Sequence, residues 1–121
     1  MDRPKEITNI IELLDVFETH LDVKLESLTA WLENGNHRKY QIRVSGEMHS
    51  RNGVNLKLPT RVIVDAYDSA GRILGTNNDT ADFLESIDPG KFYGFHTFSV
   101  IAEIPITSVS KIRVYPKRCQ Q

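Results

Sequence analysis

The side chains in this sequence that are best suited to bind a transition metal are its histidines and its single cysteine. No two histidines are two, three or four residues apart, so neither one strand nor one helix places two of them side by side. Cys119 lies in a polar C-terminal segment that offers no environment to activate a thiol. A metal site would need histidines and carboxylates from different strands, and the sequence by itself predicts none. The histidines are His20, His37, His49 and His96.

An oxygen-rich run over residues 77–82 is the other candidate for metal chemistry. Ca²⁺ takes about six to eight oxygen ligands, and this run could supply the carboxylates of Asp79 and Asp82. Its spacing matches no Ca²⁺ loop motif, and we favour an ordinary turn. The alternative hypothesis is a small Ca²⁺- or Zn²⁺-dependent binding protein or hydrolase that uses this loop with His49 or His96.

The sequence contains no Gly-x-Ser-x-Gly motif, no phosphate-binding loop and no Gly-rich dinucleotide turn. Nucleophilic catalysis needs a Ser, Cys or Thr beside an oriented base, and no such pairing can be read from the residue order. We therefore expect a protein that is not an enzyme, has no catalytic residues and uses no cofactor.

The charges are nearly balanced, with 15 Lys and Arg against 16 Asp and Glu and a net charge of −1. Such a surface exerts no long-range attraction on nucleic acids or anionic lipids, so we expect neither as a partner. Basic residues do concentrate near the C-terminus. They form either a modest anion-binding patch or a solvated edge that discourages sheet pairing. These residues are Lys111, Arg113, Lys117 and Arg118.

Aromatic residues crowd residues 92–98, which belong to a predicted strand over 91–104. Tyr93 and Phe95 share one face of that strand, and Phe98 lies on the other. A bulge at Gly94 would turn Phe95 inward, or an N-terminal helix would cover the second face. If neither holds, Tyr93 and Phe95 mark a surface for a partner.

An apolar stripe at steps of three and four residues predicts one amphipathic helix over residues 8–21. The stripe must be covered, either by the helix's own domain or by another protein. Its candidates for a partner surface are Ile10, Leu14 and Phe17. A homodimer is one form that such binding would take.

After Val23 the apolar period changes to two, which is typical of half-buried strands. The parity slips near Ser27, and this slip predicts a β-bulge. Short turns rich in Asn, Gly, Asp and Pro separate the apolar runs. The predicted strands cover residues 23–32, 40–49, 61–67, 72–75, 91–104 and 112–115, with 76–80 a loop or a twisted strand edge.

This pattern predicts a mostly-β protein, an immunoglobulin-like antiparallel β-sandwich of six to seven strands preceded by one helix. The whole chain, residues 1–121, is expected to be a single domain. The sandwich would cover residues 23–116, ending at Pro116, and residues 117–121 would form a polar tail.

Residues 40–116 resemble the FxLYD-type domains, which are small bacterial immunoglobulin-like sandwiches. The resemblance rests on the strand 42–48 with its central glycine, on Tyr67-Asp68 turning into 71–75, on the 88–90 turn before an aromatic strand, and on the closing strand 111–115. Ala66 departs from the pattern, because the family has Leu there. The resemblance implies a sandwich fold and brings no catalytic residues.

Four of the first six residues are charged and lead into no apolar stretch, and no apolar run reaches the ~20 residues that would span a bilayer. A sandwich with one cysteine fits a reducing compartment. We therefore expect a cytoplasmic protein, or an exported one if a leader has been removed. The expected function is non-enzymatic binding of a protein partner.

Overall fold

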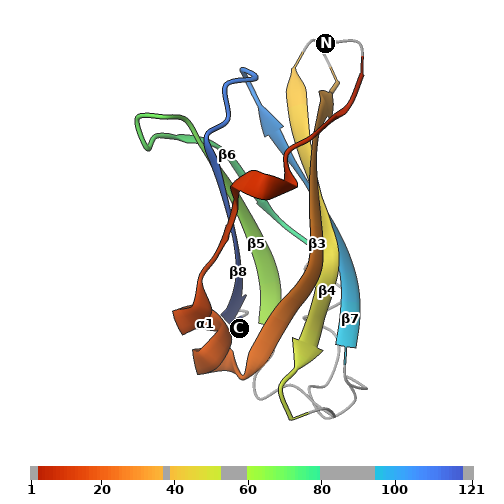
Figure 1. The fold of residues 1–121 in the computed structure, drawn as a ribbon, viewed down its shortest axis with the longest axis vertical. Coiled ribbons are helices and arrows are strands. Elements are labelled where there is room, and N and C mark those ends of the chain that lie inside the picture. Colours follow the sequence, from red (N-terminus) through yellow and green to blue (C-terminus); the bar gives the residue numbers. More distant parts are fainter. Residues whose placement is uncertain (1–2, 37–38, 53–59, 80–94, 119–121) are drawn as a thin grey trace.

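The structure is a computed structural model that describes residues 3–36, 39–52, 60–79 and 95–118. Its strands form two four-stranded sheets that lie face to face in two layers (Figure 1). The predicted mostly-β sandwich is confirmed. The first sheet has the order β1-β3-β4-β7, with β1 (Lys5–Glu6), β3 (Val23–Asn34), β4 (Tyr40–Ser50) and β7 (Phe95–Ile104). The second sheet has the order β2-β8-β5-β6, with β2 (Ile11–Leu13), β8 (Lys111–Arg118), β5 (Thr60–Tyr67) and β6 (Ile73–Asn78).

Each of the two hairpins keeps both its strands in one sheet, β3 with β4 and β5 with β6. The chain then returns once to each sheet, where β7 pairs with β4 and β8 pairs with β5. The chain therefore crosses from one sheet to the other after β4, after β6 and after β7.

Alternation along the long strands builds one apolar core between the sheets. In β4, Ile42, Val44 and Met48 are fully buried, while Arg43 and Glu47 lie on the opposite face. Burying an aliphatic side chain of this size contributes about 1.5–3 kcal/mol before entropy losses. The same alternation leaves the outward positions of the first sheet available for function.

Strand β3 contains the predicted bulge. Its pairing with β4 shifts register between Glu26 and Thr29, and Ser27 adopts a positive φ of 56°. A Cβ at Gly46 of β4 would collide with the Leu28 side chain, which explains a glycine in the middle of this strand. Because the bulge adds one residue, Glu26 and Thr29 both pair in the outward register although they are three residues apart.

The predicted helix over 8–21 is wrong in its first half. Residues Thr8–Ile10 form a 3-10 turn, η1, the next three residues form β2, and the α-helix α1 covers only Asp15–Leu21. β2 pairs with β8 in parallel, so the sandwich is not purely antiparallel. The apolar periodicity predicted a helix, but residues 11–13 instead pair with the open edge of β8. The hydrogen bonds with β8 stabilise this segment more than a short isolated helix would.

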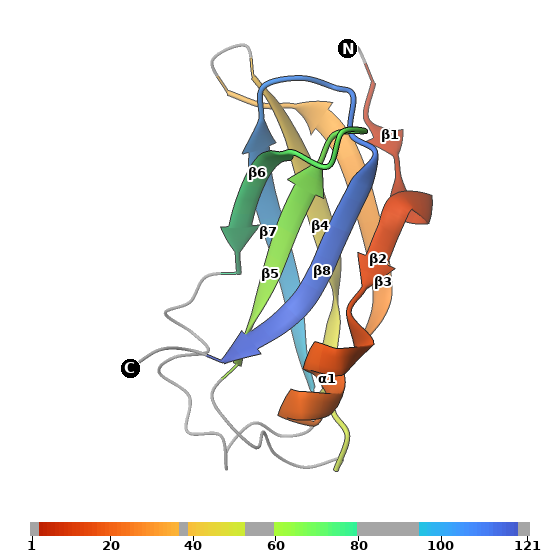
Figure 2. The ribbon, with the colours of Figure 1, turned by 90° about the vertical axis from the view of Figure 1, so that its left-hand side faces the viewer.

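The N-terminal segment lies against both sheets (Figure 2). Its β1 pairs with β3, and β2 pairs with β8. Between them, Thr8 Oγ1 accepts a hydrogen bond of 3.0 Å from the Ala30 N–H, and the Ile7 N–H donates to the Ala30 carbonyl at 2.8 Å. The segment therefore satisfies backbone groups along one open side of the sandwich.

Helix α1 continues this cover at one end of the molecule (Figure 2). Leu21 is buried, and the buried Glu18 carboxylate accepts a 2.8 Å hydrogen bond from the Leu25 N–H of β3. Asp22 ends the helix in the left-handed conformation, with φ of 57°. Among the described residues, no helix is long and apolar enough to cross a membrane.

Strand β8 ends later than predicted and runs through Pro116 to Arg118, because β5 pairs with it as far as Arg118. β2 pairs only with residues 112–114, so one side of β8 is open at Pro116 and a proline is tolerated there. Residues 117 and 118 of the predicted polar tail therefore belong to β8, and residues 119–121 lie outside the described residues. Residues 76–78 belong to the edge strand β6, which was one of the two expectations for them. The predicted β7 residues 91–94 lie outside the described residues.

Candidate functional site

The outward side chains of β3, β4 and β7 stand in rows across the first sheet. One row joins Trp31, Arg43 and Ile101 through directly paired positions. Trp31 is 38% exposed and Ile101 36%, so both offer apolar surface to a partner. Two further rows, Glu26-Glu47-Thr97 and Lys24-His49-Phe95, lie beyond the bulge.

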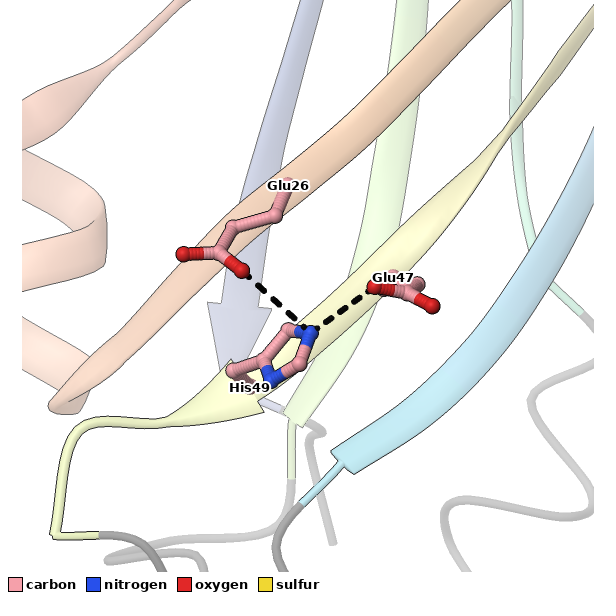
Figure 3. Close-up of side chains that lie close together, drawn as sticks. All are labelled: Glu26, Glu47 and His49. Carbon is pink, nitrogen blue, oxygen red and sulfur yellow. Dashed lines mark hydrogen bonds and ion pairs between the residues drawn. The ribbon is translucent and has the colours of Figure 1, made fainter.

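These two rows bring together a cluster of Glu26, Glu47 and His49 (Figure 3). The His49 Nε2 atom lies 3.0 Å from Glu47 Oε1 and 3.5 Å from Glu26 Oε2. One ligand atom from each residue lies within 4.8 Å of the other two. Among the described residues this is the one group of three His, Cys, Asp or Glu side chains with such spacing.

The cluster is half-buried, with side-chain exposures of 40% for Glu26, 35% for Glu47 and 33% for His49. The Phe95 ring stacks on the His49 imidazole with ring centroids 5.3 Å apart and planes inclined by 16°. Lys24 Nζ lies 3.5 Å from Glu26 Oε1, which is the carboxylate oxygen that does not face the imidazole. The three donor atoms are therefore oriented by neighbours and still accessible to solvent.

Strand geometry explains how the sequence forms this cluster. Glu47 and His49 are two residues apart on β4, so both side chains point to one face. Glu26 pairs directly with Glu47 across the strands, immediately before the bulge. The residue order indicated His49 as a candidate ligand but neither of the two glutamates. The Glu-x-His spacing on a clean strand was a usable signal, whereas the contribution of Glu26 depends on a register that cannot be read from one strand.

In the predicted metal site at residues 77–82, the described side chains make contacts that hold strands together. Asp79 is 4% exposed, and its Oδ1 accepts a 3.0 Å hydrogen bond from the Val62 N–H, so it ties the end of β6 to β5. Its Oδ2 lies 3.9 Å from His96 Nε2. Asn77 uses its amide to donate to the Ile101 carbonyl at 2.7 Å. Asp82 lies outside the described residues, and the described part of the run holds no group of three metal ligands.

Burial controls the ionisation of this pair. Desolvation raises the pKa of Asp79 from its ordinary 3.8, against weaker opposing effects of the Val62 N–H, His96 and Arg61. Desolvation likewise lowers the pKa of His96 from 6.5, and the nearby Asp79 opposes that shift. Both pKa shifts disfavour the charged form relative to the free side chain, which fits a structural contact better than a cation site.

The expectation that Phe95 turns inward is wrong. Its side chain is 52% exposed on the outer face, and α1 packs against β8 and β3 at a distance from it. The remaining alternative, an outward aromatic ring, describes Phe95. Tyr93, the second aromatic candidate, lies outside the described residues.

The three helix-stripe candidates for a partner surface separate in the structure. Ile10 packs against the core, and Leu14 is half-buried at the start of α1. Phe17 is 45% exposed, yet its ring contacts Tyr115 with centroids 5.3 Å apart. Ile10, Leu14 and Phe17 therefore do not form one exposed stripe, although Leu13 and Val16 of the same segment are also exposed, by 41% and 78%.

The basic residues near the C-terminus divide into two groups on the second sheet. Lys111 and Arg113 each lie 3.2 Å from a carboxylate oxygen of Glu12, and the hydrogen bond from Lys111 is the main cause that lowers the pKa of Glu12. Lys117 and Arg118 instead line a shallow hollow of about 200 Å³ with Arg61. Lys111 and Arg113 therefore share one carboxylate within the protein, which offsets part of the charge of the predicted patch.

The structure leaves the outer face of β3, β4 and β7 as the surface where exposed apolar side chains and metal-binding donors coincide. Comparison of the chain with known protein families, with curated proteins and with solved structures finds no match in any of the three.

Proposed function

We propose that the protein is a non-enzymatic binding module that engages a protein through the outer face of β3, β4 and β7. The row Trp31-Arg43-Ile101 is the observation that carries this proposal. Trp and Arg are the residue types most enriched at interface hot spots, and a neighbouring aliphatic side chain completes an apolar strip. A single exposed Leu or Ile would not by itself indicate a binding surface.

The sheet edges are less suited to binding than this face. Asn77 of β6 donates to the Ile101 carbonyl of β7, and a Cβ at Gly75 would collide with the Glu103 carbonyl, so β6 lies tightly against that edge. The N-terminal segment covers β3 and part of β8. Among the described residues, the sheet edges therefore offer few backbone groups that could pair with an added strand from a partner.

We propose that the partner bound at this face is a second copy of the chain. The charges of the face are mostly paired within it, Arg43 with Glu33 at 3.0 Å and Lys24 with Glu26 at 3.5 Å. A strongly acidic or basic partner therefore gains little there. A two-fold axis between two such faces sets the apolar row against itself, with Trp31 opposite either Trp31 or Ile101 of the other copy.

The size of the face predicts weak association. Nine residues of β4, from Gln41 to His49, span about 27 Å, and three strands span about 14 Å. That footprint is below the ~800 Å² per partner of a standard stable interface. We therefore expect a dissociation constant in the micromolar range, with monomers in dilute solution.

Light scattering over a dilution series tests the proposal. The wild-type chain should change from dimer to monomer, and Ile101→Glu should be monomeric throughout because it buries a charge in the apolar row. Ile73→Glu is the matched control, since Ile73 is 57% exposed on β6 of the other sheet and should leave the dimer intact. A wild-type monomer at every concentration, or equal loss of dimer in both variants, would contradict it.

The proposal also includes a cellular location and a protein family. A cytoplasmic location is supported by the single cysteine, which cannot form a disulfide within the chain. Membership of the bacterial FxLYD-type immunoglobulin-like domains is supported by the motifs of residues 40–116.

A further inference from the structure

We propose that Glu26, Glu47 and His49 bind one first-row divalent cation of the Zn²⁺ type on the outer face of the first sheet. This site is separate from the apolar row and does not depend on the proposed self-association. It differs also from the metal site predicted at residues 77–82, because Asp79 is committed to the β5–β6 contact.

The donor set selects the class of metal. One imidazole nitrogen with two carboxylate oxygens is a ligand combination that Zn²⁺ accepts, and in zinc sites with three protein ligands a water takes the fourth position. Mg²⁺ and Ca²⁺ prefer oxygen ligands throughout and gain little from an imidazole. A nearby solvent-filled hollow of about 580 Å³, which Glu26 and His49 line, leaves room for that water.

Two of the three distances between donor atoms already approach those of a filled site. In a tetrahedral zinc site with bonds of about 2.0–2.1 Å, neighbouring ligand atoms are roughly 3.3–3.4 Å apart. The two distances from His49 Nε2, 3.0 Å to Glu47 Oε1 and 3.5 Å to Glu26 Oε2, bracket this value. The third separation, between one carboxylate oxygen of each glutamate, is within 4.8 Å, and rotation of the glutamate side chains would complete the coordination.

Electrostatics favour a cation at this position. Glu26 and Glu47 are directly paired across the strands, and like charges in such a pair repel each other. Lys24 contacts only the outer oxygen of Glu26, so it does not occupy the space between the three donors. A divalent ion there would interact with both carboxylates at once and remove their repulsion.

The surroundings hold the donors in place before any ion binds. β4 lies between β3 and β7, so Glu47 and His49 project from a strand that is paired on both sides. Stacking by Phe95 restricts the orientation of the His49 ring. Sites built on such strands are preorganised, and an orienting neighbour of a metal-bound histidine strengthens binding.

Calorimetric titration of the full, tag-free chain with ZnCl₂ tests the inference, in a Cys119→Ser background that removes the only thiol. We expect one ion per chain, a higher melting temperature with Zn²⁺, and much weaker binding of Mg²⁺. Glu26→Gln, Glu47→Gln and His49→Asn should each weaken Zn²⁺ binding at least about tenfold.

Matched controls separate the site from adventitious binding. Glu103→Gln alters a carboxylate of the same face, and His20→Asn alters an exposed histidine of α1, so both should bind like the parent chain. The two glutamine substitutions in the cluster should melt no lower than the parent without metal, since each relieves a like-charge pair. Ile101→Glu should still bind Zn²⁺ even if it abolishes self-association.

Two results would overturn the inference. One is the absence of saturable Zn²⁺ binding below millimolar concentration. The other is stoichiometric binding that all three cluster substitutions leave unchanged, which would place the ion elsewhere. Failure of self-association affects neither outcome, so the two proposals can fail independently.

Discussion

At the scale of single residues, the buried carboxylate of Asp79 shows how position decides the role of a polar group. It looked like a candidate metal ligand in an oxygen-rich run, but it caps the Val62 N–H from a site that is only 4% exposed. Because burial raises its pKa, the ionised form is disfavoured in the folded protein. The group therefore makes stability depend on pH in a direction opposite to that of most surface carboxylates.

The substitution Asp79→Asn tests this sign. A raised pKa means that the group favours the fold while it is protonated, and this contribution is lost as pH rises from 3.8 through the folded pKa. Asparagine keeps the acceptor for Val62 and never ionises. Its melting temperature should exceed that of the wild type near pH 7 and converge with it below pH 3.8.

Asp68 supplies a control of opposite sign. Hydrogen bonds from Arg72 and Ala70 N–H groups lower the pKa of this turn carboxylate below 3.8. Its contribution is present above that value and is lost as pH falls, so Asp68→Asn should melt lower than wild type near neutral pH. If Asp79→Asn behaved in the same way, the account of its burial would be wrong.

At the scale of elements, the N-terminal segment is where local pattern and tertiary pairing disagreed. Ile10, Ile11, Leu13 and Leu14 fit a helical stripe, and nothing in that stretch reveals that β8 has an open edge for residues 11–13. The alternation of β4 and the parity slip near Ser27 were predictable because each is visible within one strand. The Glu26-Glu47-His49 cluster was not, since it requires the pairing register of two strands.

Helix α1 is short, and beside the buried Leu21 its attachment includes one buried hydrogen bond that sequence could not reveal. Glu18→Ala would leave the buried Leu25 N–H without its acceptor and should lower the free energy of unfolding by about 1–3 kcal/mol in urea titration. Glu18→Gln retains an oxygen acceptor of similar reach and should lose much less. Equal losses in the two variants would show that the charge, rather than the acceptor, holds the helix in place.

At the scale of the whole molecule, the two outer faces of the sandwich differ in character. On the second sheet, Glu12 forms ion pairs with both Lys111 and Arg113, and Asp65 accepts a 2.8 Å hydrogen bond from the Tyr115 hydroxyl. On the first sheet, the Trp31-Arg43-Ile101 row leaves apolar surface exposed, and the proposed metal-binding donors lie two and three rows away. The polar groups of the second face are thus largely paired within it, whereas the first face combines an apolar row with candidate metal ligands.

The most direct test of the binding face uses Trp31, the only tryptophan of the chain, as its own reporter. Acrylamide quenching of its fluorescence should be measured from well below to well above the dissociation constant found by light scattering. If two copies join through this face, quenching will decrease as the protein is concentrated, because the ring becomes covered. Quenching that stays constant while the protein dimerises, or while it remains monomeric, would contradict the assignment of this face.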